Sequence, residues 1–258
     1  MGNIFKKILF RLLVNKLTGN IICFFYPHLI PDTRWPGYRF SIKRDGINKS
    51  LAASIFFGFY EAGEIRFIHK YYSGNTDVIE LGGSMGIVTS HLASILKAGR
   101  KLITVEANPF LEKTLLSNVS RYINKESEFT ILTKAIAYHS SEVALHITGN
   151  STETTALNLG NNGNDDEVIV KSIKLSDIIL KFNLIDYTLV CDIEGSEIEL
   201  LKNETVGLEN CIEMFIELHE TTTEEGMIST DKLKEIIEKV HKFRFVQSNG
   251  PVMYFKRP

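Results

Sequence analysis

The chain of 258 residues is 44% hydrophobic and 23% charged, which is typical of a globular protein with a buried core. Its formal net charge of -2 lacks the basic surplus that neutralises phosphates, so we expect no nucleic-acid partner. The three cysteines, Cys23, Cys191 and Cys211, are odd in number and widely spaced. They argue against a disulfide framework and favour the reducing cytoplasm.

An N-terminal segment, residues 1–70, precedes the main domain that we expect over 71–258. Residues 4–17 alternate apolar and basic side chains at helical spacing, which predicts a basic amphipathic helix. This helix could pack on the main domain or on a second copy in a homo-oligomer. Alternatively, residues 1–20 could lie on the anionic inner face of a membrane. The apolar run at 21–26 is far shorter than the ~20 residues that a membrane span requires.

From residue 75 onward, short apolar runs alternate with helical patterns. The runs predict strands at 77–81, 102–106, 129–137, 187–193 and 211–218. The helices are predicted at 87–97, 109–123, 175–182, 196–203 and 230–240. This alternation predicts an α/β domain, a doubly wound and mostly parallel sheet with helices on both faces.

Two features depart from plain alternation. Residues 142–147 and 168–173 predict an extra strand pair between the third and fourth strands. Residues 243–247 and 252–256, separated by Ser-Asn-Gly-Pro, predict a hairpin. A terminal antiparallel hairpin is how the class I methyltransferase (Rossmann-like) fold ends, whereas dinucleotide-binding domains usually keep their last strand parallel.

The first predicted strand runs directly into a turn of small residues, in the sequence DVIELGGSMG. Gly82, Gly83 and Gly86 let the backbone turn sharply and let a ligand approach closely. Ser84 stands where the dinucleotide motif needs a glycine. The carboxylate of Glu80 would repel a pyrophosphate, but it suits the cationic sulfonium and ammonium of S-adenosylmethionine. A tight structural turn without a ligand remains the alternative.

The second predicted strand ends in Glu106, about 20 residues after the glycine turn. At this spacing a carboxylate can bind both hydroxyls of a ribose. Alone, an acid at this position is a weak indication of a cofactor site, but together with the glycine turn it is a strong one.

Four segments together resemble the FkbM-type methyltransferases: VIELGGSMG, TVEANP, KAIA at 134–137 and CDIEGSEIELL at 191–201. The family typically has V-x-D-x-G-A-N-x-G and K-x-D-x-E-G-x-E, and the resemblance covers roughly residues 55–220. It implies S-adenosyl-L-methionine as cofactor and O-methylation of hydroxyls on sugars, surface glycans, polyketides or other secondary metabolites. It also implies cofactor contacts at Ala107, Asn108, Ala135 and Asp192. Cys191 replaces the usual lysine, and we interpret it as a buried strand residue.

The acceptor side is expected where the fourth and fifth strands end. Asp192, Glu194 and Glu197 surround a glycine before a helix, and Glu217 and His219 follow the next strand on one side. We expect His219 to be the general base, assisted by Asp192, with Glu194 and Glu217 nearby. Glu197 is interpreted as structural. A histidine that is merely hydrogen-bonded at a strand end is the alternative.

Several possibilities remain open on the acceptor side. Asp192, Glu217 and His219 could gather a divalent metal, which we do not favour because metal-specific spacing is lacking. The polar stretch at 148–166 predicts a loop that covers a small-molecule, glycan or lipid-linked acceptor.

A nucleotide-dependent oxidoreductase or epimerase would need glycine spacing and a Tyr-x-x-x-Lys pair that this sequence lacks. A non-catalytic binding module on the same fold is a further alternative.

Overall fold

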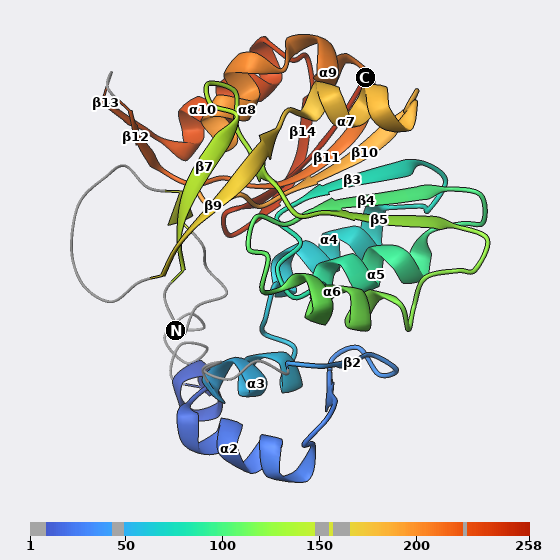
Figure 1. Ribbon diagram of the computed structural model, residues 1–258, viewed down its shortest axis with the longest axis vertical. Helices are drawn as coiled ribbons and strands as arrows, with labels where there is room; N and C mark the ends of the chain where they lie inside the picture. The colour runs from blue at the N-terminus through green and yellow to red at the C-terminus, as the bar shows by residue number, and fades with distance from the viewer. Residues whose placement is uncertain (1–8, 43–48, 148–154, 157–165, 224–225) are drawn as a thin grey trace. The chain divides into compact units, whose positions relative to one another are not determined.

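The computed structural model describes residues 9–42, 49–147, 155–156, 166–223 and 226–258 (Figure 1). The chain forms two compact units. The first contains the N-terminal residues up to Ala62, and the second begins at Gly63. The boundary expected after residue 70 falls within helix α4 (Ala62–Tyr71).

The described part of the first unit begins with two helical segments rather than one. Residues 9–13 are helical, and α2 (Lys16–Phe25) follows after a bend. The bend has a local cause, because the side chain of Asn15 caps α2 by accepting from the backbone N–H of Thr18 at 3.0 Å. The single helix predicted over 4–17 is therefore wrong in its second half, and residues 4–8 lie outside the described residues.

The rest of the first unit is a small strand pair and a helix. Strands β1 (Ile30–Pro31) and β2 (Arg39–Phe40) are antiparallel, and α3 (Lys49–Phe56) follows. Helices α2 and α3 approach closely, since a Cβ on Gly19 would overlap the backbone carbonyl of Lys49. Among the described residues, no helix has the length and apolar character needed to cross a membrane.

The second unit is built on a seven-stranded sheet with the order β14-β15-β11-β10-β3-β4-β5. Strand β15 pairs antiparallel with both neighbours, and the other neighbouring pairs are parallel. The mostly parallel sheet and the C-terminal hairpin predicted from the sequence are therefore confirmed. The strands are β3 (Asp77–Leu81), β4 (Lys101–Val105), β5 (Glu128–Leu132), β10 (Tyr187–Cys191), β11 (Cys211–Glu217), β14 (Arg244–Asn249) and β15 (Val252–Lys256).

Helices cover both faces of this sheet (Figure 1). One face carries α4, α5 (Ile87–Ile95) and α6 (Glu112–Val119). The other carries α7 (Leu175–Phe182), α8 (Glu197–Asn203), α9 (Thr205–Glu209) and α10 (Thr230–Lys239). Because both faces are covered, the central strand β10 is buried at all five positions, as its apolar sequence predicts.

A second sheet, with the order β6-β9-β7-β8, corrects one predicted strand. Residues 129–137 do not form a single strand, because β5 ends at Leu132 and β6 (Ala135–Ile136) joins the second sheet. The backbone N–H of Lys134 turns the chain there by donating to the carbonyls of Leu132 (2.9 Å) and Glu106 (3.2 Å).

The extra strand pair predicted from the sequence is confirmed. It consists of β7 (Glu142–Ile147) and β9 (Asp166–Ile173), which are antiparallel. Most of the predicted acceptor-covering loop between them lies outside the described residues, and its short described part is strand β8 (Thr155–Ala156). The sequence analysis missed a further small hairpin, β12 (Thr221–Thr223) and β13 (Gly226–Ile228).

Candidate active site

The glycine turn lies between the end of β3 and the start of α5. Gly82 has φ 92, and a Cβ there would overlap the backbone carbonyl of Asp192. Gly83 has no room for a side chain either, because a Cβ would overlap the side chain of Thr104. Ser84 (φ 45) and Gly86 (φ 78) complete a left-handed path into the helix. The turn therefore brings the ends of β3, β4 and β10 together.

Glu80 is a buried acid beneath this turn, with 1% of its surface exposed. One carboxylate oxygen accepts a hydrogen bond from the hydroxyl of Thr104 at 2.8 Å. The other, Oε1, has no hydrogen-bond partner of good geometry among the described residues, although the hydroxyl of Thr89 is near enough to lower the pKa of this acid. Burial raises the pKa of Glu80 to about 7, because the charged form loses its hydration.

Glu106 follows β4 and is held by backbone N–H groups. Its Oε2 accepts from Ser84 at 2.6 Å, and its Oε1 accepts from Asn108 at 2.7 Å. Burial raises the pKa of Glu106, and these two hydrogen bonds oppose the rise. Each oxygen keeps a second lone pair, so the carboxylate can still accept from two ligand hydroxyls. The side-chain nitrogen of Asn108 is buried without a partner in the described part of the chain.

These groups fit S-adenosylmethionine. Glu80 and Glu106 are two buried carboxylates, and no ion pair joins either of them to a described lysine or arginine. A buried charge is costly unless it is paired, and a sulfonium or ammonium group would supply the missing cation. Oε1 of Glu80 and the amide of Asn108 offer unsatisfied polar atoms to a polar ligand.

An apolar cluster lies beside the Glu106 segment. Ala135 is buried with Leu145 of β7 and Val170 of β9, and Ala107 packs against them. Three strands of the second sheet and the loop after β4 thus contribute to one buried apolar cluster. Both alanines that the family resemblance points to belong to it.

The predicted acceptor side lies where the neighbouring strands β10 and β11 end. They are parallel, and Cys191 pairs with Ile216, so the residues that follow both strands emerge at the same edge. Nε2 of His219 lies 3.6 Å from a carboxylate oxygen of Glu194, 3.6 Å from one of Glu217 and 3.9 Å from one of Asp192. The structure therefore brings together all four residues predicted for the acceptor side.

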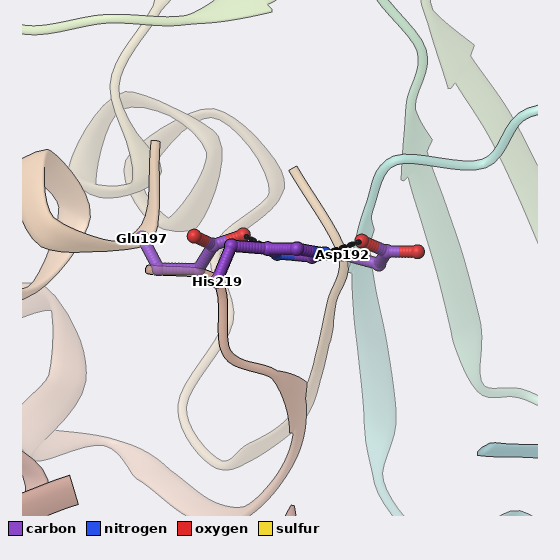
Figure 2. A group of neighbouring side chains, drawn as sticks. All are labelled: Asp192, Glu197 and His219. Atoms are coloured by element: carbon purple, nitrogen blue, oxygen red, sulfur yellow. Dashed lines mark hydrogen bonds and ion pairs between the residues drawn. The ribbon is translucent and has the colours of Figure 1, made fainter. Parts of the chain in front are cut away.

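Glu197 is the contact that the sequence analysis missed. Its side chain is fully buried, and its Oε1 lies 3.1 Å from Nδ1 of His219 (Figure 2). The same oxygen accepts from the backbone N–H groups of Ile193 and Gly195, each at 3.3 Å. Because a carboxylate accepts, Nδ1 carries the proton, and Nε2 faces the other three acids. Glu197 therefore closes the turn before α8 and also orients His219.

The electrostatics of this cluster favour a protonated histidine. The hydrogen bond to Glu197 raises the pKa of His219 to about 9, with burial opposing the shift and the nearby carboxylates adding to it. The pKa of Glu217 is raised by burial, while His219 lowers it. The cluster therefore favours the imidazolium form of His219, whose ordinary pKa is ~6.5.

The comparison with family models gives one match, the methyltransferase FkbM domain, over residues 83–246. The chain belongs to the FkbM methyltransferase family. As a member it is an S-adenosylmethionine-dependent methyltransferase, which makes the oxidoreductase or epimerase alternative wrong. No curated protein matches the sequence.

Solved structures that are similar to this chain include two named as methyltransferases and a complex of TrmK. Magnesium protoporphyrin IX methyltransferase (ChlM) from Synechocystis PCC 6803 with bound SAH is 8% identical, with a TM-score of 0.46 and 81% of this chain and 87% of that chain covered. For precorrin-6y C5,15-methyltransferase from Geobacter metallireducens GS-15 the identity is 9%, the TM-score 0.42 and the coverages 85% and 94%. M. capricolum TrmK in complex with S-adenosyl-homocysteine is 14% identical, with a TM-score of 0.38 and with 74% of this chain and 65% of that chain covered.

Cys191, where FkbM methyltransferases usually have lysine, is a fully buried residue of β10. Burial raises its pKa well above the ordinary thiol value, and the nearby carboxylates of Glu197 and Asp192 add to the effect. A thiol that stays protonated is a poor nucleophile and a poor base. The interpretation of Cys191 as a buried strand residue is confirmed.

The acceptor side of this FkbM methyltransferase also has the donor atoms for a cation. Asp192, Glu197 and His219 each offer one ligand atom, and these atoms lie within 4.8 Å of one another (Figure 2). Glu197 replaces Glu217 in the set that the sequence suggested. A metal ion bound there would compete with a proton for a ring nitrogen of His219.

Proposed function

We propose that this FkbM methyltransferase methylates the oxygen of a hydroxyl group on a sugar, a surface or lipid-linked glycan, or a secondary metabolite. One observation carries the proposal: the buried Glu197 holds His219 with Nε2 directed at the carboxyl edge of the sheet. Ligands of open α/β sheets bind at this edge. A hydroxyl must lose its proton to attack carbon, so an oxygen acceptor needs such a base.

The cofactor side is assigned from the glycine turn and the two buried acids. S-adenosylmethionine supplies an electrophilic methyl group whose bonding electrons stay on sulfur. Glu106 accepts from the ribose hydroxyls, and Glu80 places a negative charge near the cationic end. Ala107, Asn108 and Ala135 line the rest of the proposed cofactor site. Gly82, Gly83, Ser84 and Gly86 form the turn beside these acids, and the two adjacent glycines let it pack against Asp192 and Thr104.

His219 removes the proton from the acceptor. Its neutral form has a free lone pair on Nε2, because Nδ1 donates to Glu197. As the acceptor oxygen forms its bond to carbon, its proton moves to Nε2. Glu197 then stabilises the resulting imidazolium, and Asp192 lies 3.9 Å from the nitrogen that receives the proton. His219 is thus the base and Glu197 a positioning residue.

The charge of the cluster favours a neutral polyol as acceptor. Asp192, Glu194 and Glu217 accept hydrogen bonds but offer no donor when they are ionised. Neighbouring hydroxyls of a sugar match this pattern, whereas the phosphates of a nucleic acid would be repelled. The same reasoning disfavours a phosphorylated group directly at the site of transfer.

The test is transfer of an isotope-labelled methyl group from S-adenosylmethionine into glycan, lipid-linked glycan and metabolite fractions. We expect S-adenosylhomocysteine to form together with a labelled O-methyl group, identified by NMR of the product. Label on nitrogen or carbon would refute the hydroxyl acceptor. Cofactor binding without turnover on any fraction would instead support a non-catalytic module.

A further inference from the structure

The N-terminal helices of the first unit expose several large apolar side chains. On α2, Phe24 is 79% exposed and Phe25 69% exposed, and their rings contact each other edge to face. We call the set the N-terminal apolar surface; it comprises Leu9, Phe10, Leu12, Leu17, Ile21, Phe24 and Phe25. Exposed apolar side chains that occur singly are ordinary, but these all fall within residues 9–25, and Leu17, Ile21 and Phe24 share one face of α2 by helical spacing, which marks an interaction site.

Helix α2 already has an inner face that is buried. Gly19 and Ile22 are its buried residues, and Gly19 meets the start of α3. The opposite face carries Leu17, Ile21 and Phe24 rather than the polar residues that a solvent-facing helix normally has. A helix that is apolar on both faces calls for an apolar environment on its outer side.

Charge indicates what that environment is. The first 31 residues contain four basic residues, Lys6, Lys7, Arg11 and Lys16, and no Asp or Glu. They therefore carry +4, and the remaining residues carry -6, since the whole chain carries -2. In the described part of the chain, Arg11 and Lys16 are exposed next to the apolar side chains.

We propose that the N-terminal apolar surface binds an anionic lipid bilayer, with α2 lying in the interface. Aromatic and aliphatic side chains enter the boundary between headgroups and acyl chains, and the cations pair with the lipid headgroups. A second copy fits less well as the partner, because two N-terminal segments that each carry +4 would repel each other. The proposal does not depend on which acceptor the catalytic unit methylates.

The experiment is flotation of the full-length protein with vesicles of phosphatidylcholine mixed with phosphatidylserine, and with vesicles of phosphatidylcholine alone. We expect flotation with the anionic vesicles and a decrease of at least tenfold in the partition coefficient without phosphatidylserine. The double variant Phe24→Ser/Phe25→Ser should lower binding at least tenfold. The double variant Arg11→Gln/Lys16→Gln should lower it about fivefold per charge.

The matched control is Leu180→Ser/Ile185→Ser, which removes two apolar side chains that are equally exposed in the catalytic unit. It should float like the wild type. Circular dichroism and S-adenosylmethionine binding should be unchanged in all variants, because the substituted residues are exposed. The proposal is overturned if wild type fails to float or if the N-terminal variants float like the control. It is also overturned if sedimentation shows a dimer that Phe24→Ser/Phe25→Ser dissociates, since the surface would then bind a second copy.

Discussion

The cofactor side and the acceptor side of the sheet edge both use acids, but they hold them differently. Glu106 is fixed by the backbone N–H groups of Ser84, in the turn after β3, and of Asn108, in the loop after β4. Only 7% of its surface is exposed. On the acceptor side, Asp192, Glu194 and Glu217 are partly exposed and gather around His219. The cofactor side is therefore fixed by the backbone, whereas the acceptor side depends on a pair of side chains, Glu197 and His219.

The largest expected effect is on the acceptor side. His219→Ala should lower turnover by ~10²–10⁴-fold, because the acceptor loses its general base. Binding of S-adenosylmethionine should stay near the wild-type value, since the cofactor side is fixed by other residues. Steady-state kinetics with an accepted substrate, together with calorimetry for the cofactor, would measure both quantities.

The matched control for this variant is His139→Ala, since His139 is an exposed histidine that pairs with Glu199. It should have normal kinetics. A near-normal rate for His219→Ala at pH 7 would make His219 structural and move the search for the base to Asp192, Glu194 and Glu217. Dialysis against EDTA should not change the wild-type rate, and a loss that Mg²⁺ restores would favour the metal at this cluster.

A smaller effect is expected on the cofactor side. Glu106→Ala should weaken S-adenosylmethionine binding at least tenfold, because charge-assisted hydrogen bonds contribute ~1.5–3 kcal/mol each. Glu106→Gln keeps one acceptor oxygen and should fall between the alanine variant and wild type. At saturating cofactor, both should turn over far faster than His219→Ala.

Glu128→Ala is the control, because it removes an exposed carboxylate at the start of β5. An unchanged dissociation constant for Glu106→Ala would contradict the assignment of the ribose site. A loss of the folded state in the alanine variant alone would leave the glutamine variant to decide, since its amide oxygen can still accept from one of the two backbone N–H groups, that of Ser84 or that of Asn108.

The same contrast explains what the sequence could predict. The glycine turn, Glu80 and Glu106 lie at strand ends that apolar runs define, so their place follows from local pattern. His219 and Asp192 were predicted to meet because their strands were expected to be neighbours. The pairing of His219 with Glu197 could not be predicted, because it depends on how deeply the first turn of α8 is buried. The division of residues 129–137 between two sheets could not be predicted either, because β5 and β6 both consist largely of apolar residues.

For the N-terminal helices, the sequence showed the overall pattern but not where the helix breaks. The amphipathic pattern of residues 4–17 was evident, but the break at Asn15 was not, because apolar periodicity continues through it. Asn15 precedes Thr18 in a spacing that permits a cap, and this was the signal available. The apolar outer face of α2 became visible only when α3 was found on its other side.

The most direct test of the account is the pH dependence of kcat/KM for wild type and Glu197→Gln with an identified acceptor. In wild type, kcat/KM should rise as pH rises through about 9, because His219 must lose a proton to act as base. Glu197→Gln removes the charge that favours the imidazolium, so this rise should move to lower pH, toward ~6.5. Glu199→Gln, two residues further along α8, should keep the wild-type profile. An unchanged rise in Glu197→Gln, in a protein that still folds and binds cofactor, would contradict the claim that Glu197 and His219 act together.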